Sequence, residues 1–174
     1  MTTLNRRLSF GWALLLVGAA WAAHAEPPEN VRKQFPVLTG SYLGQEPPGM
    51  KPELFAPGVV STGMATRDLA MTPDGDEIYF GVSVAGRSMI MVTRQVDGVW
   101  TEPAVAPFSG VHLDLEPCIS PDGKRFYFLS TRPQEGQEAR PGWVYQDIWV
   151  MDRGAGSWGE PYNLGPPVNS EAQE

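Results

Sequence analysis

The chain has little of the chemistry on which disulfides, metal sites and most catalytic centres depend. Its only cysteine is Cys118, so no disulfide can form within the chain and packing alone must hold the fold. We expect Cys118 to be a small buried residue of a strand. The two histidines are His24, in a predicted leader, and His112, and one histidine with one cysteine cannot make a usual zinc site. The sequence therefore predicts no cofactor, no metal site and no catalytic residue.

Helical periodicity is missing as well, and positive charge is scarce. From residue 53 onward no stretch repeats apolar residues at helical spacing, which excludes a parallel sheet with crossover helices. The chain holds 13 Lys and Arg against 20 Asp and Glu, a formal net charge of −7. An acidic protein is a poor partner for nucleic acid or for an anionic membrane surface. We therefore expect neither partner.

The N-terminus has the pattern of a signal peptide over residues 1–25. A basic pair, Arg6 and Arg7, precedes an apolar run that is short for a membrane span and ends at Ala25 in a small-x-small cleavage pattern. We expect the mature chain to begin at Glu26 and to be periplasmic or secreted, with no membrane insertion after cleavage. Loss of two arginines leaves 11 basic against 20 acidic residues, a net charge of −9.

The rest of the chain divides near residue 52. Residues 26–52 are rich in Pro and Gly and lack apolar periodicity, which predicts an extended N-terminal segment. Residues 53–174 instead carry one pattern twice, so we expect a single repeat domain there.

The repeat is explicit in the sequence. Met71–Phe80 and Ile119–Phe128 each contain a Pro-Asp-Gly turn followed by alternating aromatic and apolar residues, which is typical of a hairpin between half-buried strands. Each copy continues into an apolar strand and ends in Trp-x-Glu-Pro, at Trp100 and Trp158. We expect the recurring aromatic residues to pack between the repeats as core.

Four short strands per repeat at this period predict an all-β fold made of β-propeller blades. We expect antiparallel strands over Leu69–Thr72, Glu77–Val82, Ser88–Arg94 and Glu102–Ala106 in the first blade, and over Cys118–Ser120, Arg125–Ser130, Asp147–Arg153 and Glu160–Leu164 in the second. Residues 53–57 match the fourth strand but precede both blades. Propellers carry about 4–8 blades. The expected fold is therefore partial: an N-terminal orphan fourth strand and two full blades.

The second copy resembles the WD-repeat-like β-propeller family with TolB-type repeats. The resemblance rests on Ser120–Arg132 and on Asp147–Met151, and it indicates the N-terminal part of a longer propeller. It implies exported four-stranded blades that bind proteins, peptides or sugars, sometimes as the non-catalytic domain of a hydrolase. The first copy departs from the pattern, since Thr72 replaces the serine and no Ser-x-Arg follows.

The second copy also carries an insertion that the first copy lacks. Its Pro-Asp-Gly turn lies 48 residues after the first turn, but its tryptophan lies 58 residues after the first tryptophan. The extra residues fall around Pro133–Val144, between the second and third strands, and insertions in repeat proteins map to loops that often carry binding. The predicted binding residues here are Arg132, Arg140, Trp143 and Tyr145.

A second candidate group is His112, Asp114 and Glu116, ahead of the second Pro-Asp-Gly turn. These residues are candidates for ligand binding, and the two carboxylates, expected to face the same way along an extended strand, resemble a glycosidase pair. Because Asp68 occupies the place of Glu116 in the first copy, a structural role is the stronger interpretation. The sequence thus favours an exported binding module. The alternatives are the propeller part of a serine-peptidase-type hydrolase and a propeller glycosidase or lyase.

Overall fold

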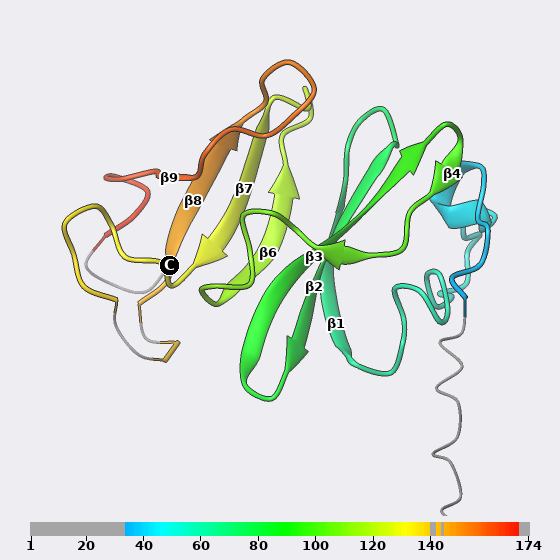
Figure 1. The fold of residues 1–174 in the computed structure, drawn as a ribbon, viewed down its shortest axis with the longest axis horizontal. Helices are drawn as coiled ribbons and strands as arrows, with labels where there is room; N and C mark the ends of the chain where they lie inside the picture. The colour runs from blue at the N-terminus through cyan, green and yellow to red at the C-terminus, as the bar shows by residue number, and fades with distance from the viewer. Residues whose placement is uncertain (1–33, 140–141, 144, 171–174) are drawn as a thin grey trace, which may run out of the picture. The chain divides into compact units, whose positions relative to one another are not determined.

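The computed structural model describes residues 34–139, 142–143 and 145–170, and all structural statements below concern these ranges. The predicted signal peptide 1–25 and Arg140 lie outside the described residues. The prediction of an all-β fold is confirmed, because the strands form two antiparallel sheets and the described ranges contain no α-helix (Figure 1). No helix of the described ranges is long and apolar enough to cross a membrane.

The first sheet contains the first repeat copy. Its strands are β1 (Ala65–Met71), β2 (Glu77–Val84), β3 (Arg87–Val96), β4 (Val99–Trp100) and β5 (Ala104–Val105). The order is β1-β2-β3-β4, and β5 also pairs with β3. Strand β4 was not predicted. It forms because Asp97 and Gly98 both take positive φ, 51° and 77°, as a two-residue hairpin turn requires.

The second sheet contains the second copy, with strands β6 (Asp114–Ile119), β7 (Arg125–Ser130), β8 (Asp147–Asp152) and β9 (Tyr162–Asn163) in consecutive order. Its first hairpin repeats that of the first sheet. Gly75 and Gly123 have φ of 79° and 69° and donate 2.8 Å hydrogen bonds to the carbonyls of Thr72 and Ser120. The two Pro-Asp-Gly turns therefore close the same hairpin by the same hydrogen bond.

Each sheet has a bulge at the same place in its first strand. Asp68 and Glu116 take φ of 54° and 55°, and the strand register shifts around each of them. A bulge inserts one residue and turns its side chain out of the ladder. For this reason Asp114 is fully buried while Glu116 is exposed. The expectation that these two carboxylates face the same way is therefore wrong.

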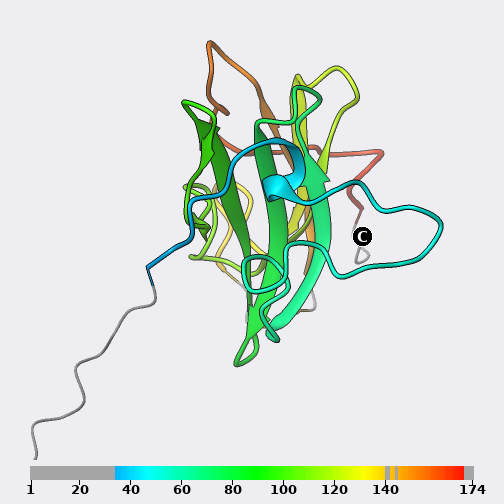
Figure 2. The same ribbon diagram turned by 90° about the vertical axis from the view of Figure 1, so that its right-hand side faces the viewer.

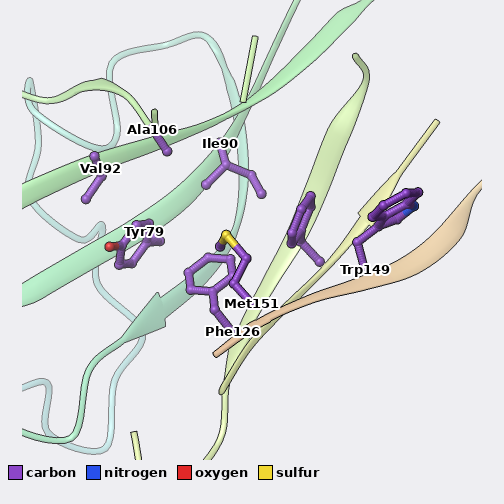
Figure 3. Close-up of a cluster of buried hydrophobic side chains, with 8 residues drawn as sticks. Tyr79, Ile90, Val92, Ala106, Phe126, Trp149 and Met151 are labelled. Atoms are coloured by element: carbon purple, nitrogen blue, oxygen red, sulfur yellow. The ribbon is translucent and has the colours of Figure 1, made fainter. Parts of the chain in front are cut away.

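The main core lies between the two sheets. The first sheet contributes one face of β2 and β3 and the second contributes one face of β7 and β8, and Figure 3 shows these side chains converging from both sheets. The buried cluster consists of Tyr79, Ile90, Val92, Ala106, Phe126, Phe128, Trp149 and Met151. Cys118 pairs with Tyr127, whose neighbours Phe126 and Phe128 point into this core, so Cys118 lies on the opposite face and is exposed. The prediction of a buried cysteine is wrong.

A polar cluster, here called the Tyr79 cluster, joins the two sheets beside that core. The Tyr79 hydroxyl accepts a 2.8 Å hydrogen bond from Trp158 Nε1 and donates to Glu77 Oε2 at 3.1 Å. Glu77 forms ion pairs with Arg94 at 2.7 Å and with Arg153 at 3.4 Å. Burial, together with the negative charge of Glu77, raises the pKa of Tyr79 to about 12. Trp158 and Arg153 of the second sheet therefore bind to side chains of the first.

The N-terminal segment, together with the chain as far as Val60, covers the other face of the first sheet. Leu43, Ala56 and Val60 are buried against a cluster that includes Phe80 and Trp100. The segment, which includes the short 3-10 turn η1 (Ser41–Gly44), crosses over the strands in Figure 2. It is anchored there because the carbonyl of Gly40 accepts a 2.7 Å hydrogen bond from Trp100 Nε1. The Pro- and Gly-rich segment thus covers one face of the first sheet.

The predicted orphan strand at residues 53–57 does not form as a strand. Only an isolated parallel bridge between Pro57 and Ser61 occurs there. The local backbone turns instead, since Ala56 takes φ of 42° and its carbonyl accepts hydrogen bonds from the amides of Val59 and Val60. Ala56 is buried and Phe55 partly buried against the first sheet, while Leu54 is exposed.

Candidate functional site

A cavity of about 510 Å³ lies at the end of the second sheet where the insertion leaves β7 and returns to β8. Three segments form its wall: the residues after β7, the start of β8 with the two residues before it, and the chain that follows β9. The lining residues are Thr131, Arg132, Pro133, Gln134, Gln137, Glu138, Tyr145, Gln146, Asp147 and Ser170. We call this space the insertion cavity.

Amide side chains hold the wall of the insertion cavity in place. Asp147 Oδ2 accepts hydrogen bonds from Gln134 Nε2 at 2.9 Å and from Asn163 Nδ2 at 2.7 Å, which ties the insertion to β8 and β9. Gln146 donates a 2.9 Å bond to the carbonyl of Trp143. The insertion turns at Gly136, with φ of 78°, and the amide of Gln137 donates to the carbonyl of Gln134 at 2.9 Å.

Arg132, predicted as a binding residue, forms the base of the insertion cavity and is mostly occupied by structural contacts. Its guanidinium donates to Asp114 Oδ1 at 3.0 Å, to the carbonyl of Phe108 at 2.8 Å and to Ser130 Oγ at 2.9 Å. It also lies over the rings of Phe128 and Trp149, 4.8 and 5.3 Å from their centres. Its side chain is 12% exposed, so only a small part reaches the cavity.

The structure does not bring His112, Asp114 and Glu116 together. Asp114 is fully buried and accepts hydrogen bonds from Ser130 Oγ at 2.6 Å and Ser109 Oγ at 2.8 Å, besides its pair with Arg132. Glu116 instead accepts a 2.6 Å bond from Arg67, whose guanidinium also pairs with Asp68. His112 is half-buried in the preceding loop.

These contacts decide the chemistry of that second group. Because Asp114 neutralises Arg132 inside the core, it has no path to a substrate, and the pair does not match two carboxylates that flank a scissile bond. The described residues contain no group of three His, Cys, Asp or Glu that could hold a metal ion. The Arg67 bridge joins the bulges of the two sheets, and this supports a structural role for Asp68 and Glu116.

The aromatic residues of the insertion are accessible. Trp143 and Tyr145 are 40% and 50% exposed, and Tyr145 lines the cavity while the carbonyl of Trp143 anchors Gln146. The predicted set therefore divides: Arg132 and Tyr145 line the cavity, Trp143 lies beside it in the chain, and Arg140 lies outside the described residues.

The sequence reasoning missed several residues of the insertion cavity. Gln134, Gln137 and Glu138 belong to the insertion but were not among its predicted binding residues, and Asp147 was predicted only to begin a strand. Their signal was the concentration of amides and carboxylates in the one segment that the first copy does not need. Ser170 has no such signal, because it reaches the cavity only through the path of the chain after β9.

The comparisons with known proteins add no name to this site. No family model matches the chain, and neither a curated protein nor a solved structure matches it. The resemblance to TolB-type repeats therefore stays a prediction that rests on the repeat residues themselves.

Proposed function

We propose that this chain is part of an exported β-propeller of the WD-repeat-like, TolB-type kind, and that it acts by binding a polar ligand in the insertion cavity. Three features support the propeller. The two sheets share the turn, the bulge and a ladder of four strands, β1-β2-β3-β5 in the first and β6-β7-β8-β9 in the second. They pack through one core, and their first strands, β1 and β6, are in contact. First strands that adjoin in successive sheets are what a radial array requires.

The observation that carries the binding function is the insertion cavity itself. Its volume of about 510 Å³ falls within the range of small-molecule sites, about 300–1,000 Å³. The segment that builds it is absent from the first sheet, which forms the same four-strand ladder without it. A loop that the scaffold does not require is free to serve recognition.

The lining indicates the chemistry of the ligand. Amides of Gln134 and Gln137 offer both donors and acceptors, while Glu138 and Asp147 offer carboxylates. The charge of Arg132 is already balanced by Asp114, so the cavity carries a negative excess. A neutral or basic ligand with several hydrogen-bonding groups, a carbohydrate or a peptide, fits this lining better than a phosphate or a nucleic acid.

A screen of the mature chain tests this function. The probes are immobilised neutral, basic and acidic oligosaccharides together with basic and acidic peptides. Replacement of Pro133–Val144 by a two-residue turn, and separately Gln137→Ala, should lower binding to the neutral or basic probes at least about tenfold, the loss of one or two hydrogen bonds. Tyr42→Ala is the matched control, since Tyr42 is 40% exposed and lies on the N-terminal segment. Undiminished binding by the shortened chain would contradict the proposal.

A further inference from the structure

The second sheet has an outer face that repeats, position by position, the face by which the first sheet binds the second. The repeat aligns Tyr79 with Tyr127, and the strand pairings align Val92 with Val150, because each is the β3 or β8 partner of that tyrosine. In the same way Ile90 corresponds to Ile148. These residues of the second sheet point away from the core between the sheets, opposite to Phe126 and Phe128.

The two faces differ in how well they are covered. Val150 is fully buried, as Val92 is. The other positions differ, because Tyr79 and Ile90 are fully buried between the sheets, whereas Tyr127 and Ile148 are only half-buried. Ala106 is 1% exposed, and its counterpart Leu164 is again half-buried. The outer face thus has the apolar residues of an interface, and around the buried Val150 they are less covered than in the first interface.

The tryptophan of each repeat binds the layer that precedes its own sheet. Trp100 donates its indole N–H to Gly40 of the N-terminal segment at 2.7 Å, and Trp158 donates to Tyr79 of the first sheet at 2.8 Å. Gln95 and Arg153 occupy equivalent positions in the two repeats, and each also binds the preceding layer. Gln95 donates to the carbonyl of Gly40 at 3.0 Å, and Arg153 forms an ion pair with Glu77 at 3.4 Å. A following sheet would use these two positions to bind the second sheet.

The ion pair that flanks the tyrosine is reversed between the two sheets. In the first sheet Glu77 of β2 pairs across the strands with Arg94, and in the second sheet Arg125 of β7 pairs with Asp152 at 3.4 Å. A hydrogen bond with the Tyr127 hydroxyl is the largest cause that raises the pKa of Arg125, followed by the charges of Tyr127 and Asp152. Where the first sheet offers a carboxylate to Arg153, the second sheet therefore offers a cation.

We infer that the outer face of the second sheet docks a further four-stranded blade, which presents an indole N–H to the Tyr127 hydroxyl and a carboxylate, not a cation, to Arg125. This inference rests on the blade arrangement proposed above and does not depend on the insertion cavity. The occupant is a sheet of the same repeat because the face continues an interface already formed between two copies of it. The charge reversal adds a specificity that the apolar residues alone would not give.

A second copy of this chain is a poorer occupant of the same face. The face that would have to pack against it is the one carrying Ile78, Phe80 and Val82, and the N-terminal segment already covers that face through Leu43 and Val60. Two outer faces could meet symmetrically only by bringing Arg125 of each copy toward the other. Self-association is accordingly an outcome that the test must register against the inference.

The test extends the chain with a third repeat of known sequence. A copy of residues 114–170 is joined after Glu171, so that the copied Asp114 takes the place of its aligned residue Ala172 and can pair with the copied Arg132, and the copied Arg153 is changed to glutamate. Two matched chains serve as controls. In the first the copied Arg153 is unchanged, and in the second the copied Arg153 is glutamate and the copied Trp158 is changed to phenylalanine. Hydrogen exchange is measured at the backbone amides of β7 and β8, and mass is checked by sedimentation.

The expected result is that the glutamate copy slows exchange in β7 and β8 by about tenfold or more relative to the arginine copy, since an unpaired charge in an interface costs more than about 1.4 kcal/mol. The tryptophan-to-phenylalanine copy should fall between the two. Tyr127→Phe in the host should remove the advantage of the tryptophan.

Three results would overturn the inference. The first is equal protection of β7 and β8 by the glutamate and arginine copies. The second is rapid exchange throughout the copy in both chains, because the same sequence forms a sheet beside the first sheet and should do so beside a matching face. The third is a concentration-dependent dimer of the unextended chain that Arg125→Glu strengthens, since that would make a second copy the occupant.

Discussion

Replacing Trp158 by alanine should destabilise the protein by about 3 kcal/mol, the low end of the 3–5 kcal/mol range for buried Trp→Ala changes. The low end applies because Trp158 is half-buried. The side chain forms three contacts that alanine cannot form. It packs edge-on against Phe126 at 5.4 Å, donates to the Tyr79 hydroxyl at 2.8 Å, and lies under Arg153 at 4.9 Å. Such contacts are worth roughly 1 kcal/mol each.

The assay is urea unfolding of the mature chain, followed by the fluorescence of the remaining tryptophans and by far-UV circular dichroism. In a thermal melt followed by the same signals, a loss of about 3 kcal/mol lowers the midpoint by about 6–12 °C in a chain of this size. Trp158→Phe keeps a ring against Phe126 and removes only the N–H donor, so it should cost about 1 kcal/mol.

Trp143→Ala is the matched control. Trp143 is 40% exposed, and only its backbone carbonyl is used by Gln146. A surface substitution of this kind should change the stability by no more than about 0.5 kcal/mol. If Trp158→Ala and Trp143→Ala lowered the stability equally, the packing of Trp158 between the two sheets would not be the cause, and the reasoning would be refuted.

Two further predictions follow from side-chain contacts, and a third follows from the N-terminal sequence. Tyr79 should ionise near pH 12 in an absorbance titration. Because its pKa is raised above the unfolded value of about 10, the stability that it contributes should be intact below pH 10 and be lost as pH rises through 12. Tyr79→Phe should abolish that loss. Arg132→Met should destabilise the protein by about 3 kcal/mol, because it leaves the buried Asp114 carboxylate unpaired. In a double-mutant cycle, Asp114→Asn should partly restore the stability of Arg132→Met. Additive losses would show that the two side chains do not interact. N-terminal sequencing of the exported protein should give Glu26 as the first residue, and an uncleaved Met1 would refute the signal peptide.

Much of the fold could be predicted because the turn residues and the alternation of apolar residues in each repeat are local sequence signals. The Pro-Asp-Gly turns, the alternation of β2 and β7 and the equivalence of Asp68 with Glu116 are all visible in the sequence. The bulges are not visible there, since strand alternation does not indicate the positive φ of Asp68 and Glu116. They reversed the expected facing of Asp114.

The covering of the first sheet could not be predicted for a related reason. The N-terminal segment has no periodicity, and its anchor joins Gly40 to Trp100 across 60 residues of chain. For the candidate site, the difference in length between the two repeats located the insertion. Of the binding residues predicted there, Arg132 and Tyr145 line the cavity. Asp147 was missed because its role depends on Gln134 and Asn163, which meet only in the folded sheet.

The most direct test of the central claim is an amide NMR titration of the mature chain with the strongest-binding oligosaccharide or peptide from the screen. Chemical-shift changes should concentrate on Gln134, Gln137, Glu138 and Asp147, with little change in the N-terminal segment or at the turn after β1. Changes that concentrate on another surface, with the residues of the insertion cavity unchanged, would show that the ligand does not bind in that cavity.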